Sequence, residues 1–215
     1  MDNEKLLKDK TILITGANGI LELRVIRKLL NLNTAIRIIG IDHRTDNVSD
    51  PEKAYCRKQI LRAVSEHPER QWKMIQADIS DKAVVEMVFQ IYRPDIVIHL
   101  GAMTVGSHEE SAYRKDFACD CFFNILEACR HSQDRRHSVS HLIYGADLAR
   151  YKSDRKRIKT QTDIYSRSCQ MVVTVLRLQP YDELSGNADT LDLIGDIVID
   201  ALLHPSAMQA ACTCI

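Results

Sequence analysis

The sequence predicts an α/β fold built on a doubly wound parallel sheet. Short apolar runs rich in β-branched residues alternate with one-sided helical stripes, which is typical of strands joined by crossover helices. The first run, residues 11–15, ends at a turn that contains Gly16 and Gly19. The second run, residues 37–41, ends at Asp42. In such a sheet the carboxyl ends of the strands share one edge, so we expect the glycine turn and Asp42 to lie together there.

The next elements follow the same alternation. We expect helices over residues 20–30, 51–66, 82–91 and 109–130, and strands over residues 72–77, 95–100 and 141–144. No linker or change of composition interrupts this stretch, so residues 1–144 form one structural unit.

The pattern is weaker in the last third of the chain. Residues 146–162 are polar and basic without a clear period, and we expect a loop there. Residues 172–178 fit either a strand or the end of a helix that begins near Asp163. Residues 191–202 have the one-sided apolar spacing of an amphipathic helix.

The composition is that of a folded protein, with 45% hydrophobic and 27% charged residues in a chain of 215. The 29 Lys and Arg residues balance 29 Asp and Glu residues, so no net basic charge attracts nucleic acid or an anionic membrane. The first ten residues lack the apolar core of a signal peptide, and no apolar run approaches the roughly 18 residues that span a bilayer. We therefore expect a cytoplasmic protein.

The cysteines predict neither disulfides nor a metal centre. Seven is an odd number, and without a secretory signal reduced thiols are expected. Two Cys-x-Cys pairs, Cys119 with Cys121 and Cys212 with Cys214, lack the wider spacing and the second ligand pair of zinc sites.

The glycine turn carries the clearest chemical signal. Gly16 and Gly19 follow a strand and precede a helix, and Asp42 ends the next strand about 20 residues later, as a dinucleotide site requires. Glycines let the backbone approach a pyrophosphate, and the amides of the helix N-terminus bind its charge. A carboxylate after the second strand accepts hydrogen bonds from the adenosine ribose. Asp42 favours NAD over NADP, whereas the nearby Arg44 favours NADP.

Five motifs, in order and at matching spacing, then resemble one family. They are Thr-Gly-Ala-Asn-Gly-Ile at residues 15–20, Gly-Ile-Asp at 40–42, Ala-Asp-Ile at 77–79, Pro-Asp-Ile-Val-Ile-His-Leu-Gly-Ala at 94–102 and Asn-Ile-Leu-Glu-Ala-Cys-Arg at 124–130. The chain resembles the extended short-chain dehydrogenase/reductases of the NAD-dependent nucleotide-sugar epimerase/dehydratase family, most of all UDP-glucuronate and UDP-glucose 4-epimerases.

The resemblance implies a Rossmann fold, NAD as cofactor, and a set of cofactor-binding residues. These are Gly16, Gly19 and Ile20 at the pyrophosphate, Asp42 at the ribose, Asp78 and Ile79 at adenine, and Leu100, Gly101 and Ala102 beside the cofactor. Three of them have plainer alternatives: Gly101 as a packing glycine, Ile79 as core, and Asp78 as a turn stabiliser.

The resemblance also implies partners. The family pairs subunits through helices that correspond to residues 109–130 and the region of Tyr165, so we expect a homodimer or a heteromer with a homologue, and a nucleotide sugar as ligand. Phe122 and Phe123 are candidate interface residues, with simple core as the alternative. Because little follows Tyr165, we assign residues 1–180 to the dinucleotide-binding domain and residues 181–215 to a much reduced C-terminal appendage in place of a substrate domain.

The chain departs from the family at the third glycine of the turn, which is Glu22 here. A carboxylate roughly 5 Å from a phosphate charge repels it by about 3 kcal/mol at an effective dielectric near 20. Alternatively, Glu22 is a first-turn acid that points outward and stabilises its own helix.

The family's catalytic set is also altered. Its Tyr-x-x-x-Lys pair is matched best by Tyr165 and Cys169, without the lysine that lowers the pKa of the tyrosine. Ala146 and Asp147 stand where a catalytic Ser or Thr is expected. A second register, Tyr151 with Arg155, is a weaker match.

The sequence therefore predicts an NAD-binding family member that is catalytically impaired, binds NAD weakly and acts through association. The alternative is an active epimerase or dehydratase on a UDP- or other nucleotide-linked sugar, in which a lysine of the basic segment activates Tyr165. A third interpretation is a dinucleotide sensor or scaffold unrelated to sugars.

Overall fold

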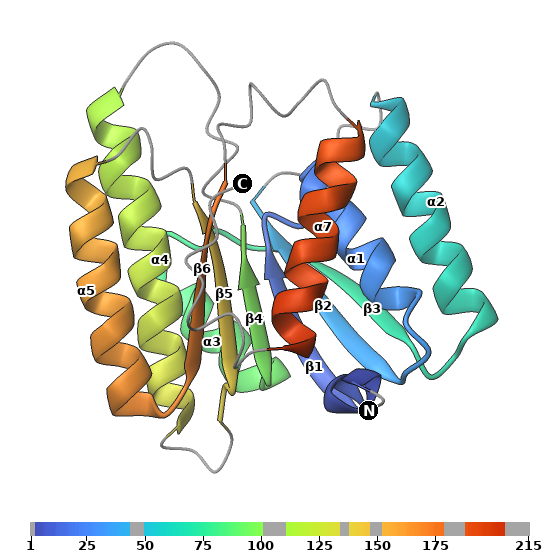
Figure 1. The fold of residues 1–215 in the computed structure, drawn as a ribbon, viewed down its shortest axis with the longest axis horizontal. Coiled ribbons are helices and arrows are strands. Elements are labelled where there is room, and N and C mark those ends of the chain that lie inside the picture. The colour runs from blue at the N-terminus through green and yellow to red at the C-terminus, as the bar shows by residue number, and fades with distance from the viewer. Residues whose placement is uncertain are drawn as a thin grey trace.

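Six parallel strands form one sheet, in the order β3-β2-β1-β4-β5-β6 (Figure 1). The strands are β1 (Lys10–Thr15), β2 (Ile36–Asp42), β3 (Gln71–Gln76), β4 (Ile96–His99), β5 (His141–Ala146) and β6 (Val172–Arg177). The computed structural model describes residues 3–43, 50–100, 111–133, 138–146, 152–178 and 188–204. The predicted doubly wound parallel sheet is confirmed, and the strand order reverses between β1 and β4.

Helices cover both faces of the sheet. On one face lie α1 (Ile20–Leu30), α2 (Pro51–Glu66) and α7 (Ala188–Leu203), and on the other α3 (Lys82–Tyr92), α4 (Ser111–Gln133) and α5 (Lys152–Cys169), while a short 3-10 helix, η1 (Asn3–Leu7), precedes β1. Each group of helices packs with its sheet face into a separate hydrophobic cluster. The fold is therefore a three-layer sandwich, as Figure 1 shows.

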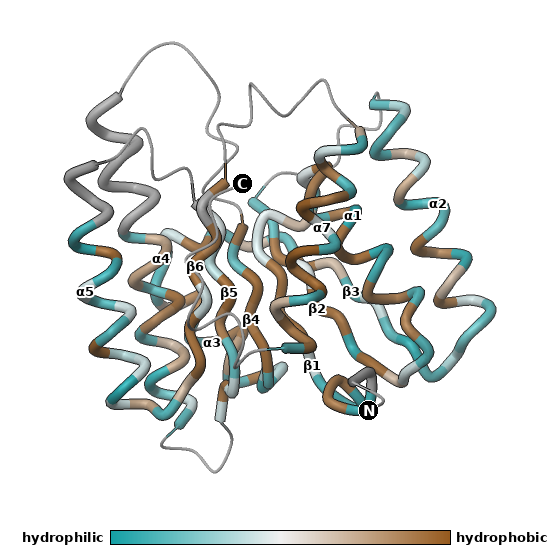
Figure 2. The backbone as a smooth tube through the Cα atoms, viewed as in Figure 1, coloured by the Kyte–Doolittle hydropathy of each residue, from teal (hydrophilic) through white to brown (hydrophobic). Residues whose placement is uncertain are grey.

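The central strands are mostly apolar because both of their faces are buried. In β1, Ile12 and Ile14 enter the cluster under α1, whereas Leu13 enters the cluster under α3 and α4. Ile14 lies in register with Gly40 of β2 and Ile98 of β4. Figure 2 shows the resulting apolar band along the middle of the sheet.

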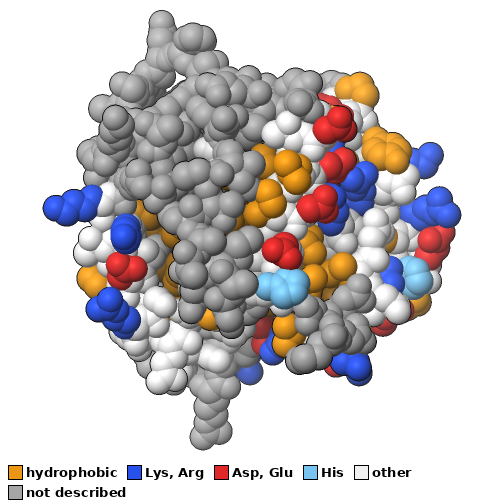
Figure 3. All heavy atoms as spheres, in the orientation of Figure 1, with side chains coloured by type: hydrophobic (Ala, Val, Ile, Leu, Met, Phe, Trp, Pro, Cys, Tyr) orange, Lys and Arg blue, Asp and Glu red, His pale blue; other side chains and the backbone are white. Residues whose placement is uncertain are grey.

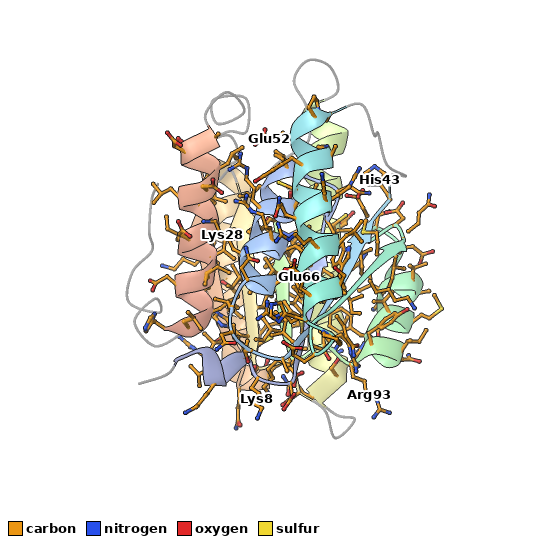
Figure 4. All side chains as sticks on the ribbon, turned by 90° about the vertical axis from the view of Figure 1, so that its right-hand side faces the viewer. Lys8, Lys28, His43, Glu52, Glu66 and Arg93 are labelled. Carbon is orange, nitrogen blue, oxygen red and sulfur yellow. The ribbon has the colours of Figure 1, made fainter. Side chains whose placement is uncertain are left out.

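Helix α7 packs against α1 through apolar contacts and an ion-pair network. Asp192 of α7 pairs with Arg24 at 2.7 Å and with Arg27 at 3.0 Å, and Asp196 pairs with Lys28 at 2.5 Å. Figure 3 shows acidic side chains in a row over α7 with basic ones beside it, and Figure 4 shows α7 and α2 on either side of α1. The described part of the C-terminal region thus completes one helical layer, while the domain division at residue 180 stays a prediction.

The basic segment differs from the expectation. We expected a loop over residues 146–162, but helix α5 begins at Lys152. Its buried residues include Ile158, Thr162 and Cys169, at helical spacing, and most of the intervening positions are polar or charged. With about one apolar residue per turn, the stripe was too sparse for the sequence pattern to reveal. The strand interpretation of residues 172–178 is confirmed by β6.

None of the helices within the described residues is both long enough and apolar enough to cross a membrane.

Candidate functional site

The glycine turn is fastened to the end of β2. Gly16 has φ 67°, a left-handed conformation that favours glycine. The amide of Ala17 donates to the carbonyl of Ile41 at 3.0 Å, and the amide of Asn18 donates to Oδ2 of Asp42 at 3.0 Å. The structure therefore brings together the turn and the acidic residue that the sequence predicted at this edge.

Asp42 links three segments of this edge. Its carboxylate holds the turn through Asn18, its other oxygen lies 3.5 Å from Nδ1 of His43, and its backbone carbonyl accepts the amide of Ala77 at 3.0 Å. The residue is only 9% exposed. It is held in one position at the carboxyl edge of the sheet, beside the segment that carries Asp78.

The segment after β3 is a tight polar turn. Oδ1 of Asp78 accepts the amide of Ser80 at 2.8 Å, which is the turn-stabilising role considered for it. Asn124 of α4 donates to the carbonyls of Ile79 at 3.0 Å and Ser80 at 2.8 Å. Sequence reasoning placed Asn124 in a helix motif but missed this function of tying α4 to the turn.

Other predicted cofactor residues are placed in part. Ile20 begins α1 and is buried, Leu100 is fully buried directly after β4, and Ile79 packs against the cluster under α3 and α4. Gly101 and Ala102 lie outside the described residues.

Glu22 lies inside the turn. Its side chain is 1% exposed, and a Cβ added to Gly19 would meet its Oε2 at 1.9 Å. Oε2 has no hydrogen-bond partner among the described residues. Burial, together with the charge of Asp42, raises the pKa of Glu22 to about 8, although its own backbone amide and Lys53 oppose the rise. The outward-pointing alternative for Glu22 is wrong, and burial favours the neutral form of its carboxyl group.

Helix α1 lacks the N-cap side chain that the neighbouring helices α2 and α3 have. Asp50 caps α2 and Asp81 caps α3, each accepting two backbone amides of the first turn. Helix α1 instead has Gly19 at its N-cap, which offers no side chain. Glu22, at the third helical position, is the acidic residue of the first turn of α1, and its own backbone amide opposes the rise of its pKa.

This arrangement decides how well the turn fits a dinucleotide. A diphosphate needs the space over the second glycine and the first amides of the helix. With Glu22 in its observed position, that space holds a carboxyl group, and the turn does not fit a diphosphate. Asp42, the residue expected at the ribose, is held at the same edge by the amide of Asn18.

A second polar pair lies where the strand order reverses. Oγ1 of Thr15 is 2.6 Å from Nδ1 of His99, at the ends of β1 and β4. The imidazole stacks on Tyr144, with ring centroids 5.3 Å apart, and Tyr144 stacks on Phe122 at 3.9 Å. Burial lowers the pKa of His99 to about 4, so the ring is neutral, and its Nε2 has no partner among the described residues.

This aromatic stack decides between the two interpretations of Phe122. Its side chain is fully buried between α4 and the sheet, so it belongs to the core and not to an interface. Phe123 is half-buried, with the guanidinium of Arg157 4.7 Å from its ring centroid. The sequence did not single out His99, although a histidine at the end of an apolar strand is a recognisable signal.

Tyr165 lies away from the glycine turn. It is in the last turns of α5, the end that leads into the amino end of β6, whereas the turn follows the carboxyl end of β1 (Figure 1). Its hydroxyl donates to Oε1 of Glu127 on α4. Burial and this hydrogen bond raise the pKa of Tyr165 to about 12, while Arg130, at 2.9 Å, lowers the pKa of Glu127 to about 2.

The other predicted catalytic positions are described incompletely. Cys169 is a buried free thiol that packs in the same cluster as Tyr165. Asp147 and Tyr151 lie outside the described residues. Only the backbone is described for Ala146, at the end of β5, and for Arg155, in α5.

Comparisons with known proteins agree with this architecture. The solved structures include UDP-glucose 4-epimerase from Thermotoga maritima, with a TM-score of 0.57, 18% identity and coverage of 78% of this chain and 55% of that chain. A short-chain dehydrogenase/reductase from Mycobacterium ulcerans matches with a TM-score of 0.64 at 10% identity, covering 94% of this chain and 86% of that chain. At these identities the likeness concerns the fold.

Curated relatives share more of the sequence. A dTDP-glucose 4,6-dehydratase of Neisseria meningitidis serogroup B is 31% identical over 127 residues, which are 56% of this chain and 32% of that protein. The same-named enzyme of Haemophilus influenzae is 35% identical over 92 residues, 42% of this chain and 24% of that protein. The matched segments thus span about a third or less of these relatives. Residues 12–178 match the model of the NAD dependent epimerase/dehydratase family. The resemblance seen in the sequence is confirmed, and the chain belongs to this NAD-dependent family.

Proposed function

We propose that this chain is a catalytically impaired member of the NAD-dependent epimerase/dehydratase family, which binds NAD weakly and acts in the cytoplasm by associating with another protein. The observation that carries the impairment is the position of Tyr165, the best match to the family tyrosine: it lies at the end of α5 that leads into β6, away from the glycine turn, with its hydroxyl on Glu127. A family tyrosine acts as a base, and this one has a carboxylate at its hydroxyl in place of a lysine nearby.

The raised pKa of Tyr165 leaves almost no tyrosinate that could act as a base. With a pKa of about 12, only about one Tyr165 hydroxyl in 100,000 is ionised at pH 7. Position 169, where the family pattern has a lysine, carries a buried thiol. Neither the Glu127 carboxylate nor the Cys169 thiol supplies the positive charge that would stabilise a tyrosinate.

Weak NAD binding follows from the two halves of the site. Asp42, the residue expected at the ribose, is fixed by the amide of Asn18, which supports binding, whereas Glu22 occupies the turn and opposes it. The nucleotide part of a dTDP- or UDP-linked sugar is the proposed second ligand, because the matched relatives are named for such substrates.

The outer face of α4 and α5 is the proposed association surface. Phe123 and Arg157 lie there in contact, and Ile164 is 52% exposed. The proposed partner is a second copy or a homologous family member.

A turnover assay tests the impairment. The chain at high concentration, with NAD added, is incubated with dTDP-glucose and with UDP-glucose, and Tyr165→Phe is run in parallel. We expect no epimerised or dehydrated product. Product that disappears in Tyr165→Phe would restore Tyr165 as a base, and product that persists would reveal a different base; either result contradicts the impairment.

Light scattering tests the association separately. We expect a dimer of this chain, or a complex when a homologue is added. Charge reversal at the contact, Arg157→Glu, is expected to weaken it, while Arg62→Glu on α2 serves as a control. A monomer in both mixtures would contradict the proposed association.

A further inference from the structure

The carboxyl group of Glu22 and the diphosphate of a dinucleotide require the same space. Glu22 is 1% exposed, and its Oε2 lies where a Cβ of Gly19 would stand. Gly19 and Glu22 both belong to the N-terminal turn of α1, whose amides would receive the diphosphate. The unpartnered Oε2 points into this turn and not away from it.

We propose that Glu22 is an internal plug of the dinucleotide turn: the neutral carboxyl group must swing out to solvent, where it can ionise, before the diphosphate of NAD can enter. The plug rests on the proposed NAD binding and specifies its regulation by pH. NAD binding would convert a buried Glu22 carboxylic acid into an exposed carboxylate, and the proton passes to the buffer.

The charges around the turn favour the neutral form of the plug. Asp42, at the end of β2, disfavours a second negative charge beside it. Lys53 of α2 acts in the opposite direction, and Arg57 of α2 reaches the turn by donating to Oδ1 of Asn18 at 3.2 Å. Burial outweighs these cations, so the carboxyl group stays protonated while it lies inside.

The same cations become available when the plug leaves. A diphosphate brings more negative charge than the carboxyl group that it replaces, and Lys53 and Arg57 stand on the α2 side of the turn to meet it. The exposed Glu22 carboxylate returns to an ordinary pKa near 4.5, so one proton is released per NAD bound between about pH 5 and pH 8.

The linkage has a definite sign. Below pH 4.5 both forms of Glu22 hold the proton, and above pH 8 neither does. Between these limits, the inward, protonated form of Glu22 becomes less stable relative to the outward, ionised form as the pH rises. NAD affinity is therefore expected to increase with pH, by up to about tenfold per pH unit.

Calorimetric titration with NAD at pH 6.5, in two buffers with different ionisation enthalpies, measures the released proton directly. For the wild-type chain we expect weak binding and release of close to one proton. For Glu22→Gly we expect binding at least tenfold tighter with no proton release. For Glu22→Gln, which keeps a neutral plug, we expect weak binding without proton release.

Glu66→Gln is the matched control, because Glu66 is an exposed carboxylate at the far end of α2. It is expected to behave as the wild type. Equal proton release from the wild type and Glu22→Gln, or equal NAD affinity of the wild type and Glu22→Gly, would overturn the plug.

A measurement without NAD separates the two proposals. Carbon-13 NMR of the Glu22 carboxyl group, assigned with Glu22→Gln, is expected to show titration near pH 8 in the chain alone. Titration near pH 4.5 would overturn the plug even if NAD binds. If Glu22 titrates near pH 8 but Glu22→Gly does not bind NAD, the proposed NAD binding is overturned, and with it the role of Glu22 as a plug. The burial of a neutral carboxyl group would then be the one part of the proposal that holds.

Discussion

Glu22 and Gly19 compete for one position at the start of α1, since a Cβ on Gly19 would lie 1.9 Å from Oε2 of Glu22. The absence of a side chain at Gly19 is what admits the carboxyl group. In a dinucleotide site the same absence admits a phosphate. The turn therefore retains the backbone of a nucleotide site and fills it with a side chain of its own.

The first prediction concerns this competition. Gly19 has φ −66° and ψ 151°, which alanine adopts without strain, so Gly19→Ala should destabilise the chain mainly by expelling Glu22. In a double-mutant cycle measured by urea unfolding at pH 6, we expect Gly19→Ala to cost at least about 1 kcal/mol more in the wild type than in Glu22→Gly. Equal costs in the two backgrounds would show that the two residues do not share this space.

The second prediction concerns pH. Because folding raises the pKa of Glu22 from 4.5 to about 8, its contribution to stability is fully present below pH 4.5 and is lost as the pH rises toward 8. Glu22→Gln stays neutral, so the wild type should lose stability relative to this variant by up to about 1.4 kcal/mol per pH unit in that window. Urea unfolding of both proteins at pH 5, 6.5 and 8 measures the difference. A constant difference would contradict a buried neutral Glu22.

The third prediction concerns His99. Its pKa falls from 6.5 to about 4 on folding, so its stabilising contribution is present above pH 6.5 and is lost as the pH falls toward 4. His99→Gln should reduce the loss of stability between pH 6.5 and 5 by up to about 1.4 kcal/mol per pH unit. Thr15→Val removes the hydroxyl partner and keeps the histidine, so this variant should retain the pH dependence. The same slope in His99→Gln and the wild type would contradict the burial of a neutral imidazole.

The fourth prediction concerns the contact between α1 and α7. The side chain of Arg24 is 7% exposed and pairs with Asp192, so Asp192→Ala leaves a buried cation with less compensation. We expect a loss of about 1–3 kcal/mol in the free energy of unfolding. Asp196, 65% exposed, pairs with Lys28, and Asp196→Ala should cost less than about 1 kcal/mol. Similar costs for the two variants would show that burial of Arg24 does not matter.

The fifth prediction concerns Tyr165. Tyr165→Phe removes the hydrogen bond to Glu127 and should cost about 1 kcal/mol of stability, with NAD affinity unchanged. Tyr55→Phe, at an exposed position of α2, should cost nothing measurable. A fall in NAD affinity in Tyr165→Phe would place this residue at the cofactor and not between α4 and α5.

The fold could be predicted from the sequence because its central strands are buried on both faces and its helices are mostly amphipathic. The run that became β1 and the aspartate that ends β2 were recognisable from local pattern and spacing alone. Helix α5 was missed because charged residues surround a sparse stripe that includes Ile158 and Thr162. The sequence pattern of one helix does not show which of its polar and charged residues a neighbouring helix will cover.

The candidate site was predictable only in outline. The sequence identified Asp42 and the unusual Glu22, but two directions for the Glu22 side chain were compatible with it. The choice depends on the space over Gly19 and on the missing N-cap side chain, which are properties of the folded turn. The partner of Tyr165 was likewise hidden, because Glu127 lies 38 positions away on another helix.

The ratio of the NAD dissociation constants of the wild type and Glu22→Gly, measured at pH 6 and at pH 8, tests the central claim most directly. If the neutral Glu22 carboxyl group closes the turn, the ratio is at least about ten at pH 6 and falls several-fold by pH 8, as the linkage requires. A ratio near one at both pH values, or one that does not change with pH, would contradict the account.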